Sequence, residues 1–444
     1  MNISDVVYAT LDEVATMPRF DMNEMPRKPR WFLRPIAWLL SFPETFKYHA
    51  KINKHGVKGL KPPYIMLCNH NSFFDFKVAT RAIFPHIANN IVAIDGFINR
   101  EELLRNVGCV LKRKFVPDAP LIKKIKHTLL VNKGISGIYP EARYSLSGTN
   151  AILPDSLGKM VKLLNYPVVT FICHGHHLQQ PVWNLKKRKV KTSADMTLIL
   201  DKSTIASKSI EAINHIIHKA FIYDDYKYQV EHKLHIKEPW RAEGLHKILY
   251  QCPHCLAEGK MTSKLDKLTC TECGQVYVMD ELGQLSAPAG ETKFRHIPDW
   301  YEWERAQVRE QIKSGNYKTE ADVHVDILQN STGFYRLGVA RLTHDAMGFN
   351  LEAIWDGHPF KVEKYPLENY SIHIEYEYFQ KGDGISISTL QDTYYLYDVE
   401  QKICVTKIHF AVEELYKIKV EEASIHAKKT KQKTAPQIQT STKG

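Results

Sequence analysis

The sequence predicts an α/β domain with a mixed or parallel sheet flanked by helices, followed by a small zinc ribbon and a β-sandwich or barrel-like domain. Three observations predict this order. Short apolar runs alternate with amphipathic segments over residues 58–228, two close cysteine pairs lie between Cys252 and Cys273, and apolar residues alternate with polar ones after Gly338. The chain has 444 residues and a hydrophobic fraction of 44%, enough for several globular cores.

Residues 1–50 are expected to form an N-terminal segment whose helix lies in a membrane interface. Aromatic and aliphatic residues from Trp31 to Phe46 follow three basic residues between Arg27 and Arg30, a pattern typical of interfacial helices. Packing of this helix on the protein's own core is the alternative. Only residues 35–43 lack a charge, whereas a spanning helix needs about 20 apolar residues.

Residues 51–245 are expected to form the α/β domain. Short continuous apolar runs indicate buried strands. Apolar residues spaced three or four apart, as from Leu121 to Lys133 before Gly134, indicate helices. The expected strands are 64–68, 91–94, 135–139, 168–173 and 196–200, and the expected helices are 121–133, 155–164 and 209–220.

Two residues that could act together, His70 and Asp75, follow directly on the first expected strand. On one continuous helix they would lie about 140° apart, so they can meet only if His70 stands in the turn before the helix. Ser72 is a suitable N-cap for such a helix. A neutral imidazole oriented by a carboxylate can take the proton of an attacking hydroxyl near pH 7. By itself the spacing also fits a turn histidine beside a helix-capping aspartate.

Four motifs, in order over residues of about 50 to 225, resemble those of the glycerophosphate and lysophospholipid acyltransferases. The second motif of that family has a glycine before an apolar pair and a basic residue, and the third is usually Phe-Pro-Glu-Gly-Thr-Arg-Ser. In this chain the four are Asn69-His70-x4-Asp75, Gly108–Lys114, Tyr139-Pro-Glu-Ala-Arg-Tyr-Ser145 and Tyr166-Pro-Val-Val-Thr170.

The resemblance implies that His70 is a general base and Asp75 its orienting partner. It implies direct transfer of a fatty acyl group from acyl-coenzyme A or acyl-carrier protein to the hydroxyl of a lysophospholipid, in phospholipid biosynthesis. It also implies that Glu141 and nearby basic residues hold the acceptor's phosphate, with 1-acylglycerol-3-phosphate as the commonest acceptor. The substrate-binding residues expected from it are Asn69, Arg113, Lys114, Glu141 and Arg143.

The second and third motifs depart from the usual pattern. Ala142 replaces a glycine, and Arg143 precedes the usual arginine position, which Tyr144 occupies. A surface ion pair is the alternative role for Arg143. In the second motif the basic residue is Arg113 or Lys114, depending on the register. Headgroups other than glycerol phosphate therefore stay open.

Residues 246–290 are expected to form a zinc ribbon. Cys252-Pro-His-Cys255 and Cys270-Thr-Glu-Cys273 supply four thiolates from two turns, the set that a closed, structural zinc site uses. Disulfides or a redox dithiol are the alternatives. The other four of the eight cysteines stand singly in apolar runs, which indicates a reducing compartment.

Residues 291–420 are expected to form a β-rich domain with a leading and a closing helix, and residues 421–444 a disordered basic tail. Ile372, Ile374 and Tyr376 alternate with polar residues, as in strands, and the run 411–419 is helical in pattern. The tail is rich in Lys, Thr and Gln and has few apolar residues. The sequence contains no ligand motif for this domain.

The formal net charge of +11 favours an anionic partner. We expect a cytoplasmic protein, peripheral on the anionic inner face of the membrane. The alternative is a non-catalytic lipid- or nucleic-acid-binding zinc-ribbon protein on an acyltransferase-like scaffold. A nucleic-acid partner ranks lower because the basic run Lys186–Lys189 is short.

Overall fold

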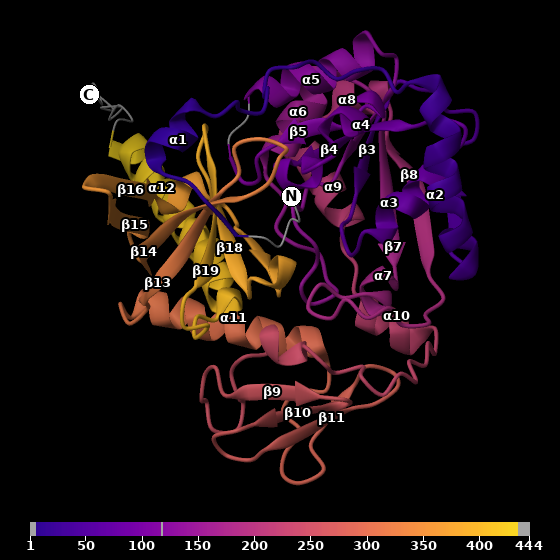
Figure 1. Cartoon of the computed structure of the whole chain (residues 1–444). Coiled ribbons are helices and arrows are strands. Elements are labelled where there is room, and N and C mark those ends of the chain that lie inside the picture. The colour runs from indigo at the N-terminus through magenta and orange to yellow at the C-terminus, as the bar shows by residue number, and fades with distance from the viewer. Residues whose placement is uncertain (1–5, 117–118, 434–444) are drawn as a thin grey trace, which may run out of the picture.

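A computed structural model describes the chain from residue 6 to residue 433, except for residues 117 and 118 (Figure 1). Within these residues the strands form a seven-stranded sheet, a four-stranded sheet and an eight-stranded sheet. The three sheets occupy separate regions of the molecule, and helix α11 (Ile297–Lys313) runs between the small sheet and the eight-stranded one.

The seven-stranded sheet is mixed, as the sequence predicts. Its order is β2-β8-β7-β3-β6-β4-β5, and β7 and β8 form its antiparallel pair. The strands β2 and β5, at the two edges of the sheet, were not expected from the sequence. The strands are β2 (Lys51–His55), β3 (Tyr64–Cys68), β4 (Ala88–Ala93), β5 (Val110–Lys112), β6 (Ile135–Ile138), β7 (Val168–His174) and β8 (Ser193–Leu200).

Helices cover both faces of this sheet because its central strand is apolar on both. Ile65 and Leu67 of β3 face a core shared with α5, α6 and α9. The alternating Met66 and Cys68 face a second core shared with α3, against which α2 packs. The helices of this domain are α2 (Arg34–Lys47), α3 (Phe74–Ala82), α4 (Glu101–Asn106), α5 (Ala119–Leu130), α6 (Ser156–Leu164), α7 (His176–Gln179), α8 (Lys202–Ser207), α9 (Ile210–Ala220) and α10 (Asp225–Glu231).

The cysteine pairs lie beside the four-stranded antiparallel sheet, β12-β11-β10-β9, with Cys270 at the end of β10 and the other three outside the strands. Trp300 of α11 joins this unit to the rest of the molecule. Its ring contacts Tyr277, and its Nε1 donates to the carbonyl of Gln251 at 3.0 Å. The strands are β9 (Met261–Lys264), β10 (Lys267–Cys270), β11 (Val276–Met279) and β12 (Leu285–Ser286).

The C-terminal domain is one open sheet, so the expected sandwich or barrel is wrong. Its order is β16-β15-β14-β13-β19-β18-β17, and the short N-terminal strand β1 (Val7–Tyr8) pairs in parallel with β14. The strands are β13 (Thr319–Ile327), β14 (Tyr335–Asp345), β15 (Gly348–Trp355), β16 (His358–Lys364), β17 (His373–Glu375), β18 (Gly384–Ser388) and β19 (Thr393–Asp398).

Strand β19 shows how both faces of this sheet are buried without a second sheet. Tyr394 and Leu396 face a core built with α11 and α12 (Val405–Lys433). The alternating Tyr395 and Tyr397 face a core that includes Phe97 of the α/β domain. Helices therefore cover one face of the sheet and the α/β domain covers the other.

Helix α12 extends further than expected. The sequence predicts a helix over 411–419 and disorder from Glu421, but residues 421–433 form the last turns of α12. Arg309 of α11 contacts Glu421 at 2.9 Å, which ties these turns to the neighbouring helix. The rest of the expected disordered tail, residues 434–444, lies outside the described residues.

Candidate active site

The turn between β3 and α3 brings His70 and Asp75 together. The Nδ1 atom of His70 lies 3.5 Å from Oδ2 of Asp75, which is fully buried at the start of α3. The same oxygen accepts hydrogen bonds from the backbone N–H groups of Asn71 at 2.5 Å and Ser72 at 2.9 Å. Helix α3 begins one residue later than expected, with Phe73 at the N-cap position, but the Oγ of Ser72 still accepts from the N–H of Phe74 at 3.3 Å. The carboxylate thus fixes the turn that carries His70.

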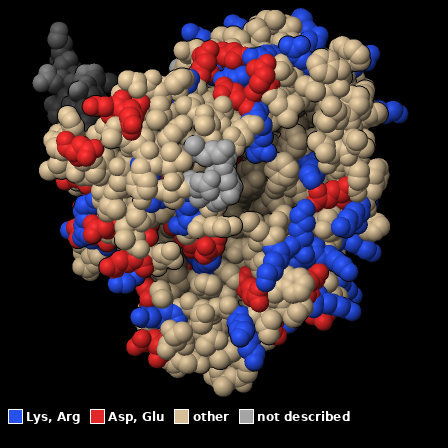
Figure 2. Space-filling model, viewed as in Figure 1, with Lys and Arg blue, Asp and Glu red and all other residues tan. Residues whose placement is uncertain are grey.

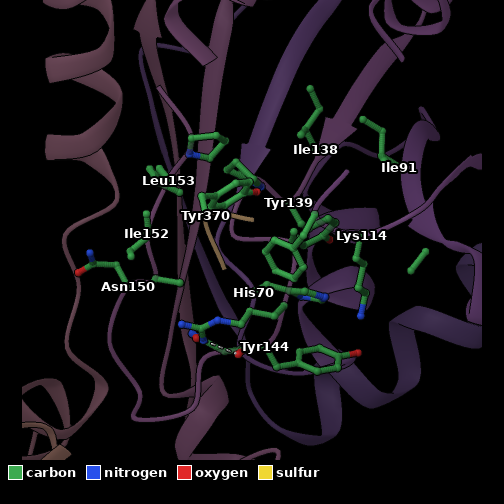
Figure 3. Close-up of a pocket in the computed structure, with 18 of the residues that line it drawn as sticks. His70, Ile91, Lys114, Ile138, Tyr139, Tyr144, Asn150, Ile152, Leu153 and Tyr370 are labelled. Atoms are coloured by element: carbon green, nitrogen blue, oxygen red, sulfur yellow. Dashed lines mark hydrogen bonds between the residues drawn. The ribbon is translucent and has the colours of Figure 1, made fainter. Parts of the chain in front are cut away.

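The imidazole of His70 is held between two tyrosine rings. The ring centroids of Tyr139 and Tyr144 lie 4.5 and 4.2 Å from that of His70 (Figure 3). The side chain of His70 is 24% exposed and lines a cavity. Burial lowers the pKa of His70 below its usual value, against the opposing effect of Asp75. The ring is therefore neutral at pH 7 and has a nitrogen, Nε2, that does not face the carboxylate.

A second histidine, His176, completes the environment of Asp75 and was missed from the sequence. Its Nδ1 lies 2.6 Å from Oδ1 of Asp75, and both side chains are fully buried. Burial alone would raise the pKa of Asp75, but hydrogen bonds from His176 and His70 lower it to about 2. His176 is 101 residues away in sequence. The available signal was a pair of adjacent histidines just after the expected strand 168–173.

Glu141 does not line the cavity with His70 but lies behind it. Its side chain is buried, and its two oxygens accept from the backbone N–H groups of His70 and Ala151, each at 2.8 Å. Burial raises the pKa of Glu141 to about 7, although these two hydrogen bonds lower it in part. Through these contacts Glu141 holds two loops together, and its carboxyl group does not bind an acyl acceptor in the cavity.

Asn69 and Arg143 are also engaged within the protein. The amide of Asn69 bonds to the backbone N–H and carbonyl of Cys173, at 2.8 and 3.0 Å, and joins the ends of β3 and β7. Arg143 is 5% exposed and contacts Glu413 of α12 at 3.3 Å. Arg143 borders the cavity, but its ion pair with Glu413 is buried, unlike the surface ion pair given above as its alternative role.

The structure separates the two basic residues that the second motif leaves as alternatives. Lys114 lines the cavity beside His70, with its Nζ 3.0 and 2.8 Å from the two ring nitrogens of His373 in β17. Arg113 is buried and points to the carbonyl of Leu390 at 3.5 Å. Of the expected substrate-binding residues, Lys114 is thus the one whose side chain is placed to meet a ligand next to His70.

The cavity has a volume of about 1840 Å³ and lies between the α/β domain and the C-terminal domain. Figure 2 shows the hollow on the surface, with Lys and Arg side chains gathered beside it. An apolar branch runs from His70 between the sheet and helices α5 and α6, past Ile91, Ile138 and Leu153 (Figure 3). The opposite wall comes from the C-terminal domain and includes Tyr370, Glu375, Tyr376 and Tyr378.

The four cysteines of the two knuckles converge, with all Sγ atoms within 4.8 Å of one another. The Cys252–Cys273 and Cys255–Cys270 pairs have Sγ–Sγ distances of 3.8 and 3.7 Å, too long for disulfides. A tetrahedral ion with metal–sulfur bonds of about 2.3 Å places its ligands about 3.8 Å apart. The donor set therefore fits a tetrahedral metal ion.

No family model and no curated protein sequence matches the chain. Among solved structures, it is similar to the crystal structure of the 1-acyl-sn-glycerophosphate (LPA) acyltransferase PlsC from Thermotoga maritima. The TM-score is 0.34 at 15% sequence identity, and the match covers 42% of this chain and 76% of that chain. A similarity of this extent does not show what this chain does.

The raised pKa of Glu141 predicts a pH-dependent stability. The folded state holds this proton up to about pH 7, whereas the unfolded state releases it near pH 4.5. Stability from protonated Glu141 is thus present at acid pH and lost as pH rises through this window, by up to about 3 kcal/mol. The unfolding free energy of wild type minus that of Glu141→Gln, from denaturant titrations, should be smaller at pH 8 than at pH 5. An unchanged difference would contradict the buried clamp.

Proposed function

We propose that this protein transfers a fatty acyl group from a thioester to the hydroxyl of a lysophospholipid. The observation that carries the proposal is the pair His70–Asp75, whose imidazole lies at a cavity with an apolar branch on one side and Lys114 on the other. The four motifs that resemble the lysophospholipid acyltransferases lead to the same reaction. Acyl-coenzyme A or acyl-carrier protein would supply the acyl group.

In the proposed reaction His70 acts as a general base. Its Nε2 takes the proton of the acceptor hydroxyl while the oxygen attacks the thioester carbonyl. Asp75, held by two backbone N–H groups and His176, keeps the Nδ1 proton of His70 in place and stabilises the imidazolium that forms. When the tetrahedral intermediate collapses, the carbon–sulfur bond breaks and His70 gives this proton to the leaving thiolate. No covalent acyl-enzyme is required.

The apolar branch of the cavity suits the acyl chain. Its lining is aliphatic and lies between the sheet and two helices, so a hydrocarbon chain there would leave water. The carbonyl at the end of the chain would then lie near His70. The lining residues are Ile91, Leu121, Ile122, Ile125, Ile138, Leu153, Leu157 and Met160.

A membrane would deliver the acceptor, and the segment from η1 (Trp31–Leu33) through α2 has a surface for it. Trp31, Leu39 and Leu40 are 77, 72 and 69% exposed, and Phe32, Ile36 and Phe46 are exposed beside them. Basic residues precede the segment, as at Arg27 and Arg30. Within the described part of the chain, no helix is long and apolar enough to cross a bilayer. We propose peripheral attachment to the cytoplasmic face of the membrane through this surface.

We further propose that the cysteine cluster holds a structural zinc ion. Cys252, Cys255, Cys270 and Cys273 would fill all four positions of a tetrahedral site, so the ion would have no place for a substrate. It would instead stabilise the small sheet, because metal binding and folding are coupled.

Replacing the base should abolish acyl transfer. His70→Ala is expected to lower kcat/KM with acyl-coenzyme A and a lysophospholipid by about 100-fold or more. Because burial lowers the pKa of His70, wild-type kcat/KM should be level between pH 7 and 8 and fall only below pH 6.5. The control His358→Ala, an exposed histidine in β16, should keep full activity. Undiminished transfer by His70→Ala, or no transfer by wild type from either donor, would refute the proposal.

Membrane attachment should depend on the exposed face of α2. Burying one leucine is worth about 1.5–3 kcal/mol, so Leu39→Gln with Leu40→Gln should weaken binding to anionic vesicles by at least about tenfold. Vesicle flotation measures this. Leu390→Gln changes an equally exposed leucine of the C-terminal domain and is the matched control. Equal flotation of all variants would show that α2 does not face the bilayer.

Purified protein should contain one equivalent of zinc. Chelation, or Cys270→Ser, should remove the metal and lower the melting temperature, because metal binding and folding are coupled. Elemental analysis and thermal unfolding measure the two effects, and Cys404→Ser, outside the cluster, serves as the control. Less than half an equivalent of zinc together with an unchanged melting temperature after chelation would contradict the assignment.

A further inference from the structure

The C-terminal domain forms the wall of the cavity that faces His70, next to the place where an acceptor headgroup would lie. Its strand β17 brings His373 to Lys114, at 2.8 and 3.0 Å. The hydroxyl of Tyr378 donates to Asp95 of the α/β domain at 2.8 Å. The headgroup region is thus built jointly by the two domains, and an inference about it rests on the acyl transfer proposed above.

This region is acidic around a single ammonium group. Asp95, His373 and Glu375 bring one donor atom each within 4.8 Å of one another. Such a group could hold a metal ion, which would bind a free lone pair on a ring nitrogen of His373. The ammonium of Lys114 lies against both of these nitrogens instead. One cation therefore faces two carboxylates, and Glu375 also pairs with His373.

The other Lys and Arg side chains that line the cavity contact other groups of the protein. Four of them are paired with carboxylates, and the other two donate to backbone carbonyls, whereas Lys114 contacts His373 beside His70. The contacts are Arg143–Glu413 at 3.3 Å, Arg305–Glu413 at 2.5 Å, Lys417–Glu414 at 2.6 Å, Lys227–Asp224 at 3.3 Å, Arg100 to Gly96 at 2.8 Å and Lys112 to Val116 at 3.3 Å.

In the third motif, Tyr144 stands where the acyltransferases usually have arginine, so this position offers a hydroxyl instead of a positive charge. Tyr144 stacks on His70 at 4.2 Å and lines the cavity. Burial raises its pKa above the usual range, and the negative charges of Glu375, Asp75 and Asp95 add to this effect. Two of these carboxylates, Glu375 and Asp95, line the cavity beside Lys114, so a second negative charge on a ligand there would meet like charges.

We propose that the acceptor is a lysolipid whose headgroup donates hydrogen bonds and carries at most one net negative charge, and not a phosphate monoester. Lys114 would contact the phosphodiester, while the carboxylates of Glu375 and Asp95 would accept from an amine or from hydroxyls. A phosphate monoester, with nearly two charges, would bring a second negative charge against the same carboxylates. The C-terminal domain is then the part of the chain that selects the headgroup.

The test compares lysolipids with one common acyl chain. Initial rates of acyl transfer by the full-length protein are measured with lysophosphatidic acid, lysophosphatidylethanolamine and lysophosphatidylglycerol, and binding of each is measured with the inactive His70→Ala protein. We expect kcat/KM for the amine or the diol headgroup to exceed that for the monoester at least tenfold. The two diesters distinguish an amine from hydroxyls as the group that the carboxylates recognise.

Charge-neutral variants assign the preference to the acidic wall. Glu375→Gln should lower kcat/KM for the preferred diester at least fivefold and raise that for lysophosphatidic acid at least threefold. Asp95→Asn should shift the ratio in the same direction and serves if Glu375→Gln fails to fold. The control Glu363→Gln removes a carboxylate from an exposed position in β16 of the same domain and should change neither value.

The outcomes are distinguishable. Lysophosphatidic acid as the best acceptor, with a ratio that neither variant changes, would overturn this inference and leave the acyl transfer standing. Absence of transfer to every acceptor, with no binding to His70→Ala, would overturn both. Preferential binding and turnover of a diester, reversed by Glu375→Gln, would support the assignment of the headgroup to the C-terminal domain.

Discussion

The buried carboxylate of Asp75 is the group on which the geometry of the site depends. An ionised carboxylate without solvent must be compensated, and here two backbone N–H groups, His70 and His176 surround it. The backbone bonds shape the turn between β3 and α3, so that His70 leaves the end of the strand and not a face of the helix. One charge thereby determines both the path of the loop and the orientation of the imidazole.

The second constraint is the burial of charges between the domains. Glu413 of α12 is fully buried and contacts Arg143 of the α/β domain and Arg305 of α11. Removing one partner of such a buried pair typically costs about 3–5 kcal/mol. With the apolar core around Phe97 and Tyr397, this network makes the C-terminal domain a fixed wall of the cavity and not a loosely attached module.

The three parts of the chain thus divide the work of the proposed enzyme. The seven-stranded sheet carries the base and the apolar branch, and the eight-stranded sheet carries the polar wall opposite them. The cysteine unit lies against α11, which also contacts α12, so a metal ion there would act on the site only through packing. Because the C-terminal domain forms one wall of the cavity, a headgroup bound there would contact both domains.

The sequence by itself determined what depends on short spacing. Continuous apolar runs determined the buried strands, the cysteine spacing determined the cluster, and the interval between His70 and Asp75 determined that a turn must bring them together. The tertiary structure decided what depends on the path of the chain: that His176 completes the carboxylate's shell, that Glu141 faces inward, and that Lys114, not Arg113, meets the cavity. It also decided that helices and the α/β domain, not a second sheet, cover the C-terminal strands. The physical reason is that an alternating strand shows which residues are buried, but not which surface buries them.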